Sequence, residues 1–212
     1  MNILRKIRRP FKYSYFNAAF LIIGINIAVF LLLKMIPRLA VYLSLNVIFL
    51  REGHMYWQFL TYMFLHSNIS HIVCNMLGLL FFGLALEKAI GSKEFVLFYL
   101  VCGALSGFFS FLVYRFTGQY RVFLLGASGA IYSVLFAYAV FFPRSVIFIW
   151  GIIPVPAPVM VLIYAIIELG SQFLGSRGNV AHMTHLFGFL AAWLYFVIRM
   201  GIHPIKVWKN AI

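Results

Sequence analysis

Long apolar runs separated by short polar or charged stretches make up most of the chain. A helix that crosses a bilayer needs roughly 20 mostly apolar residues. Dividing the chain at its charged positions predicts six such helices. Their expected ranges are about 16–33, 69–86 and 95–114, then from about 126 to before 143, within 145–174, and about 180–198.

Two further apolar stretches are too broken to be simple spans. Residues 43–57 are interrupted by Arg51 and Glu52, which predicts a partly embedded first loop at the membrane surface. Residues 146–153 precede a proline-rich segment, and proline fits the first turn of a helix but breaks its interior. We therefore expect the fifth helix to start near Pro158, after a stretch that lies on the surface or runs extended.

Composition agrees with a membrane protein, because 64% of the residues are hydrophobic and only 10% are charged. A soluble domain carries about 25% charged residues. The net charge of +13 comes from residues that flank the apolar runs, which indicates the positive-inside signal and lipid headgroups rather than nucleic acid. This bias predicts both termini in the cytoplasm. We expect one domain, residues 16–200, between a basic cytoplasmic segment, 1–15, and a short cytoplasmic tail, 201–212.

Polar clusters interrupt three of the apolar helices, and polar groups inside membrane spans indicate functional sites by default. The second, fourth and sixth helices run in the same direction, so clusters near their starts should lie at one depth, close to the outer face. Within two of these clusters, residues four positions apart share a helical face. The clusters comprise His66, His71 and Asn75, then Gly126 to Gly129 with Tyr132, and finally His182 and His185.

Small residues predict that the fourth and sixth helices approach closely. Gly129, Ser133 and Ala137 form one stripe, and Gly188 and Ala192 form another. Such stripes allow two membrane helices to pack together. Close packing would bring a serine and a histidine on different helices into hydrogen-bond range.

These clusters resemble the motifs of the rhomboid family of intramembrane serine proteases. The match extends over residues 55–192, and it implies an all-α membrane protein with a six-transmembrane-helix bundle. One departure is Gln58, where the family often has arginine, and we assign this position to the shape of the first loop. The matching motifs are Gly126-Ala127-Ser128-Gly129 with Tyr132, His66-x4-His71-x3-Asn75, and His185 with Gly188.

The resemblance implies a serine endopeptidase that needs no cofactor. Ser128 would be the nucleophile and His185 its general base, while His71, Asn75 and Ala127 would stabilise the oxyanion. Supporting roles fall to Tyr132, His66, Gly126, Gly129 and Gly188. The implied substrates are transmembrane segments cut near the outer face, and the fifth helix is the implied entry gate.

A third, acidic catalytic residue is not expected. The chain has four acidic residues, and Glu87 and Glu94 should lie on the inner side, with Glu52 in the first loop. Glu168 is nearest in depth but belongs to the fifth helix. The resemblance implies a Ser-His dyad in which Tyr132 packs against the histidine in place of an acid.

Several alternatives stay open. His182 is a second candidate base one turn before His185, although Gly188 favours His185. The chain could also be an inactive rhomboid-like protein that binds or escorts membrane helices, whereas a channel is disfavoured because the inner helix halves are apolar.

Partners and location complete the expectations. We expect membrane-protein substrates and the lipid bilayer as partners, with no nucleic acid and no metal, since Cys74 and Cys102 lack zinc-site spacing and should be buried thiols. The compact form resembles bacterial members, which implies the cytoplasmic membrane.

Overall fold

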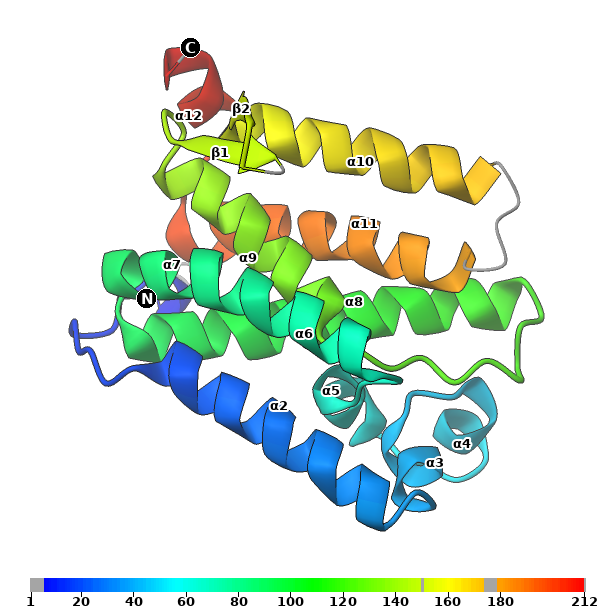
Figure 1. Ribbon diagram of the computed structural model, residues 1–212. Helices are drawn as coiled ribbons and strands as arrows, with labels where there is room; N and C mark the ends of the chain where they lie inside the picture. Colours follow the sequence, from blue (N-terminus) through cyan, green and yellow to red (C-terminus); the bar gives the residue numbers. More distant parts are fainter. Residues whose placement is uncertain (1–5, 150, 174–178, 212) are drawn as a thin grey trace.

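The computed structural model describes residues 6–149, 151–173 and 179–211, in which the chain forms a helical bundle (Figure 1). Four helical segments are long and apolar enough to cross a membrane, and two shorter apolar helices complete the predicted set of six. The long segments are α2 (Ala18–Met35), α6 (Ile69–Gly78) continued by η2 (Leu79–Gly83) and α7 (Leu84–Ile90), α8 (Ser92–Phe116), and α11 (Asn179–Tyr195) continued by η3 (Phe196–Met200). The short helices are α9 (Ser128–Phe141) and α10 (Ala157–Phe173).

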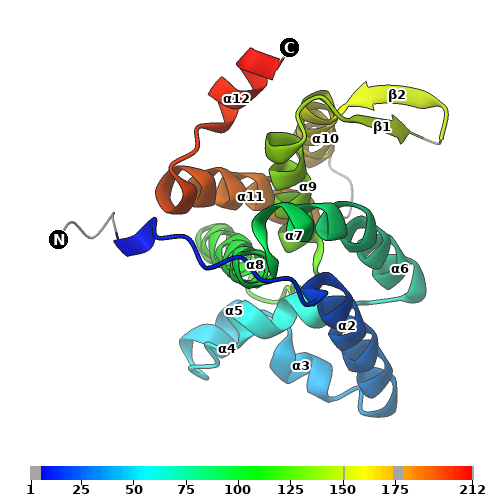
Figure 2. The same cartoon turned by 90° about the vertical axis from the view of Figure 1, so that its left-hand side faces the viewer.

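The short helix α9 lies at the centre of the bundle, with α6, α8 and α11 around it, and α10 packs against both α9 and α11 (Figure 2). Most of its side chains are buried. A helix of 14 residues is about 21 Å long, which is less than the roughly 30 Å of a bilayer core. In Figure 1, α9 starts well short of the end at which the much longer α8 finishes.

Close packing of α9 against α11 confirms the interpretation of the small-residue stripes. A Cβ atom placed on Gly188 would lie 2.3 Å from the Gly129 carbonyl oxygen, so only glycine fits there. The Ser133 hydroxyl donates across the same interface to the Gly188 carbonyl at 2.7 Å. The two helices that carry Ser128 and His185 are thereby held at backbone contact.

The first loop folds into short helices, namely α3 (Leu39–Leu43), α4 (Val47–Arg51), α5 (Gln58–Thr61) and η1 (Tyr62–Phe64). Gln58 is fully buried, accepts a hydrogen bond from the Asn46 backbone at 3.0 Å and donates to the Tyr42 carbonyl at 3.1 Å. Tyr62 fixes η1 to α8 by donating to the Gly103 carbonyl at 2.7 Å. These bonds are consistent with a shaping role for Gln58 in this loop.

The stretch before the fifth helix forms a hairpin of β1 (Val146–Ile149) and β2 (Ile153–Pro156), paired antiparallel. An extended connection was one of the two expectations, but the pairing was not predicted, and it adds a small strand element to the mostly helical bundle. The fifth helix begins at Ala157, which puts Pro158 in its first turn as expected. The expected limit of that helix, Leu174, lies outside the described residues.

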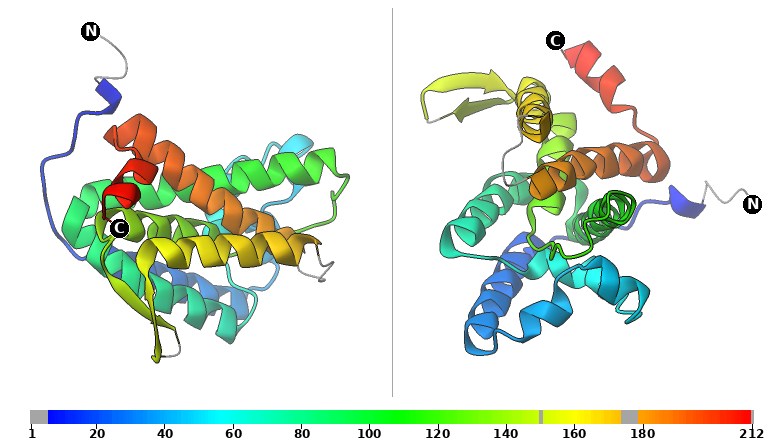
Figure 3. Two further views of the ribbon diagram at one scale, coloured as in Figure 1. Left: turned by 90° about the horizontal axis from the view of Figure 1, so that it is seen from above. Right: turned by 90° about the vertical axis from the view of Figure 1, so that its right-hand side faces the viewer.

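Both termini lie toward the same end of the bundle (Figure 3), and buried carboxylates from α7 and α8 tie helices together. Glu87 accepts hydrogen bonds from the first backbone N–H groups of α2, at 2.6 Å from Ala18 and 2.9 Å from Ala19. Glu94 pairs with Arg199 at 2.8 Å and accepts from the Tyr195 hydroxyl at 2.5 Å. Both residues therefore have structural partners remote from the polar clusters.

The last described helix, α12 (Pro204–Ala211), packs back onto the bundle. Its Trp208 indole donates to the Ala139 carbonyl of α9 at 2.9 Å and lies against Phe136. Most of the segment that was expected to form a tail is thus a helix in contact with the domain.

Candidate active site

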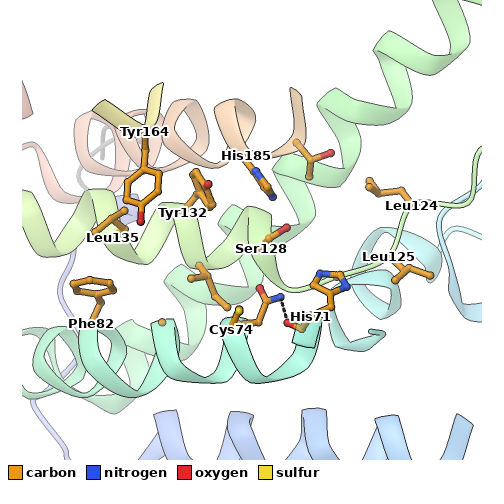
Figure 4. Close-up of a pocket in the computed structure, with 15 residues that line it drawn as sticks. His71, Cys74, Phe82, Leu124, Leu125, Ser128, Tyr132, Leu135, Tyr164 and His185 are labelled. Atoms are coloured by element: carbon orange, nitrogen blue, oxygen red, sulfur yellow. Dashed lines mark hydrogen bonds between the residues drawn. The ribbon is translucent and has the colours of Figure 1, made fainter. Parts of the chain in front are cut away.

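A cavity of about 500 Å³ brings the three polar clusters together near the starts of α6, α9 and α11 (Figure 4). Its walls are otherwise mainly apolar, with Phe82 from η2 and Tyr164 from α10 on opposite sides. The site residues predicted from the sequence that line it are His71, Asn75, Gly126, Ser128, Tyr132 and His185. These residues are far apart in the chain. The sequence predicted that they lie at one depth, because the helices that carry them run in the same direction.

Ser128 is the first residue of α9, at the end of a tight loop. Gly126 in that loop has a φ of 128°, and a Cβ atom on it would lie 2.8 Å from His71 Nε2. The Gly126 backbone N–H is anchored to the Tyr62 carbonyl at 2.9 Å. Because the first N–H groups of a helix have no partner within that helix, the Ser128 backbone N–H is available at the cavity.

His71 turns a hydrogen-bond donor toward the same loop. The Ser67 backbone N–H, which can only donate, contacts His71 Nδ1 at 3.4 Å, and the Ser67 hydroxyl lies 3.2 Å from that nitrogen. A neutral ring that accepts at Nδ1 carries its proton on Nε2, the atom next to Gly126. Asn75 donates one amide hydrogen to the His71 carbonyl at 2.7 Å, so its second amide hydrogen is available.

His66 supports this arrangement from outside the membrane-spanning helices. Its ring packs edge-on against His71, with centroids 5.0 Å apart. Only 6% of the residue is exposed, and this burial lowers the pKa of His66 to about 4. A neutral His66 therefore packs beside His71 without adding charge to the site.

His185 is held by two neighbours. Its ring stacks on Tyr132 with centroids 4.2 Å apart and planes 10° from parallel, as the resemblance implied. Its Nδ1 lies 2.8 Å from Glu168 Oε1. Among the described residues, no direct hydrogen bond joins His185 to the Ser128 hydroxyl, although both line the cavity. Such bonds are often long in enzymes without substrate.

The expectation that Tyr132 takes the place of an acid beside His185 was wrong, because a carboxylate also contacts the ring. Glu168 is 4% exposed and also contacts the Tyr132 hydroxyl and His182 Nδ1. Its position on a different helix from either catalytic candidate led to the error, because the packing of α10 on α11 brings the carboxylate to the ring. An acidic residue inside a membrane helix was the signal that could have identified it.

The two candidate histidines differ in their relation to the cavity. Among the described residues that line it, His185 is present and His182 is not. Both contact Glu168, and the three side chains offer ligand atoms within 4.8 Å of one another, so this trio could hold a metal ion. In the described structure, the Nδ1 atoms of His182 and His185 each contact one carboxylate oxygen of Glu168.

The two cysteines also differ from each other. Cys102 is fully buried as expected, whereas the expectation was wrong for Cys74, which is exposed and lines the cavity. Both are free thiols.

Comparison with known proteins places residues 53–201 in a match to the rhomboid domain. Similar proteins include RHOMBOID-like protein 12, mitochondrial, of Arabidopsis thaliana, 31% identical over 67% of this chain and 46% of the relative. The presenilin-associated rhomboid-like protein, mitochondrial, of Rattus norvegicus is 32% identical over 69% of this chain and 38% of its own length. Rhomboid protein 1, mitochondrial, of Saccharomyces cerevisiae is 28% identical over 86% and 55%.

Only part of each relative is matched. The chain spans about half the length, or less, of these curated relatives. All three carry the word mitochondrial in their names, so the expected location in a cytoplasmic membrane has no support from them. A multi-pass membrane protein is supported by both the helices and the family match.

Proposed function

The chain belongs to the rhomboid family, and from this premise we propose that it is an intramembrane serine endopeptidase. The observation that carries the proposal is that Ser128, at the start of α9, and His185, on α11, line one cavity together with hydrogen-bond donors on α6. A serine hydroxyl is a weak nucleophile until a base takes its proton. With Nδ1 directed to Glu168, the neutral His185 ring has a lone pair on Nε2 for that proton.

The proposed reaction starts with attack of Ser128 Oγ on a peptide carbonyl while His185 takes the hydroxyl proton. The tetrahedral oxyanion receives hydrogen bonds from His71 Nε2, the second Asn75 amide hydrogen and the Ser128 backbone N–H, next to Ala127. Each such donor contributes on the order of 3 kcal/mol to catalysis. His185 then protonates the leaving amine, and a water activated by the same ring hydrolyses the acyl-enzyme.

The proposed substrates are transmembrane helices of other proteins, cut near the outer face. The apolar walls of the cavity suit a segment that arrives from the bilayer, and Tyr164 of α10 and Phe82 of η2 border it on two sides (Figure 4). An intact helix hides its peptide bonds in its own hydrogen bonds, so the substrate must unwind locally. Small or helix-breaking residues near the cut would ease that unwinding.

Cleavage of a transmembrane reporter by the purified protein in detergent tests the proposal. We expect wild type to cut the reporter and Ser128→Ala to be inert, and persistent cleavage by the alanine variant would refute the assignment. His185→Ala should also be inert, while His182→Ala should keep turnover. If only His182→Ala lost activity, the base would be His182.

A covalent serine-directed probe provides a second readout. Labelling of Ser128 by a fluorophosphonate should require His185, because the probe reacts with an activated hydroxyl. A wild-type protein that neither cleaves reporters nor reacts with the probe would instead support the inactive rhomboid-like alternative.

A further inference from the structure

We propose that Glu168 is a positioning residue that makes the Ser128–His185 pair a three-residue catalytic unit, with its carboxylate supplied by α10. The inference rests on the proposed function and departs from the two-residue dyad that the sequence implied. It concerns the orientation and protonation of the base, since Glu168 touches His185 and not the reacting atoms.

Side chains of the site surround the Glu168 carboxylate and form hydrogen bonds with both of its oxygens. A buried carboxylate is costly unless its oxygens are hydrogen-bonded. Oε1 accepts from His185 Nδ1 at 2.8 Å and from the Tyr132 hydroxyl, while Oε2 contacts His182 Nδ1. All three partners are side chains at or beside the cavity, so the carboxylate is built into the site.

The contact with His185 selects one tautomer of the ring. An ionised carboxylate can only accept hydrogen bonds, so His185 Nδ1 must carry a proton and Nε2 must have the lone pair. That tautomer is the one able to deprotonate Ser128. The same carboxylate stabilises the imidazolium that forms when the proton arrives, which is the role of the aspartate in soluble serine proteases.

Two neighbours together fix the ring. Stacking on Tyr132, with planes 10° apart, holds the plane of the imidazole but leaves its rotation within that plane undetermined. The 2.8 Å contact between Nδ1 and Glu168 Oε1 determines that rotation. Tyr132 is itself bonded to Glu168, so one carboxylate orients both the ring and its support.

A purely structural role would have a different signature. Glu168 also connects α10 to α9 and α11, and α10 borders the cavity through Tyr164. If the carboxylate served only as this connection, its loss would loosen α10 and alter the binding of a transmembrane substrate. It would leave the intrinsic reactivity of Ser128 toward a small probe unchanged.

The experiment compares Glu168→Gln, Glu168→Asp and Glu94→Gln with wild type and Ser128→Ala, all as purified full chains in detergent with EDTA. Glu94 is the matched control, because it is also buried, also accepts from a tyrosine hydroxyl and lies at the opposite end of the bundle. For each variant we would measure kcat and KM on the reporter, the rate of fluorophosphonate labelling, and Tm.

We expect Glu168→Gln to lower kcat roughly 100-fold or more, by analogy with loss of the acid from a catalytic triad. KM should stay within about threefold, and labelling should slow in parallel with kcat, since both depend on the activated serine. Glu168→Asp should have a kcat about tenfold higher than that of Glu168→Gln. Aspartate restores the negative charge, but its side chain is one methylene shorter and holds the carboxylate further from His185. Glu94→Gln should lower Tm while keeping kcat.

Several outcomes would overturn the inference. One is a wild-type kcat in Glu168→Gln, and another is a change in KM alone in that variant with a normal labelling rate. A third is a loss of kcat in Glu94→Gln as large as that in Glu168→Gln. If Glu168→Gln failed to fold, Glu168→Met, which also lacks the carboxylate, would take its place, and a folded Glu168→Met with wild-type kcat and labelling would overturn the inference. Cleavage by Ser128→Ala would refute the proposed function itself, so the two failures are distinguishable.

Discussion

Replacing Gly188 by alanine tests whether backbone contact between α9 and α11 is what brings the proposed base, His185, to the proposed nucleophile, Ser128. The added Cβ atom would lie 2.3 Å from the Gly129 carbonyl oxygen and 3.1 Å from Tyr132 Cβ. An ordinary contact needs about 3.4 Å or more, so α11 must move away from α9 by about 1 Å. The displaced helix carries His185, and the helix it leaves carries Ser128.

The magnitude follows from that displacement. A misplacement of about 1 Å between catalytic groups can cost roughly 100-fold in rate. Overpacking of this kind typically also costs about 1–3 kcal/mol of stability. We therefore expect Gly188→Ala to lower kcat on a transmembrane reporter by about 100-fold and to lower Tm by several degrees in detergent.

A matched control is Gly24→Ala in α2, where nothing lies within 4 Å of the added Cβ. Alanine is the better helix former by about 1 kcal/mol, so this variant should keep kcat and should not lower Tm. Wild-type kcat and Tm in Gly188→Ala would show that α9 and α11 are not held at backbone contact, and the geometric argument for the site would fail.

Three further variants probe other parts of the structure. Gly126→Ala should slow fluorophosphonate labelling at least about tenfold, because alanine disfavours the positive φ and its Cβ would clash with the His71 ring; unchanged labelling would contradict this. Alkylation of Cys74, which is exposed at the cavity, should block labelling of Ser128, and Cys74→Ser should resist the reagent. Glu87→Gln removes the carboxylate that caps α2. The loss of the cap should cost about 1–2 kcal/mol of stability, so Tm should fall by a few degrees while kcat is retained. A lost kcat at normal Tm would refute a structural role for Glu87.

The helices were predictable because a bilayer leaves the chain few choices. Every backbone polar group in the hydrocarbon must be satisfied within the protein, so a long apolar run forms a helix. The prediction for the fifth helix succeeded for a different reason, since the position of Pro158 marks a first turn. Neither argument needs knowledge of what packs against the helix.

The first loop and the hairpin were less predictable because tertiary contacts form them. The short helices around Gln58 depend on its buried amide meeting the backbone at Tyr42 and Asn46, which lie many residues earlier. In the hairpin, Pro154 and Pro156 are unfavourable for a strand, because proline cannot donate to a ladder. Proline is nevertheless tolerated in a two-stranded ribbon, where both strands are edges.

The polar clusters were predictable and the carboxylate beside them was not, for a related reason. Depth along a helix follows from counting residues, which is why His71, Ser128 and His185 could be placed at one level. Whether Glu168 meets His185 depends on the rotation of α10 about its own axis and on how it packs against α11. No spacing within one helix encodes those two quantities.

The partners of the buried carboxylates separate structural from functional roles better than depth does. Glu87 accepts from backbone N–H groups, and Glu94 pairs with Arg199 and accepts from Tyr195, so each stabilises the fold with groups that do not line the cavity. Glu168 is equally satisfied, but by a tyrosine and two histidines whose protons can move. A carboxylate inside a membrane must find partners in either case. Because two of these partners, Tyr132 and His185, line a cavity with Ser128, the cost of burying the Glu168 charge is best explained, on the proposed mechanism, by its effect on His185.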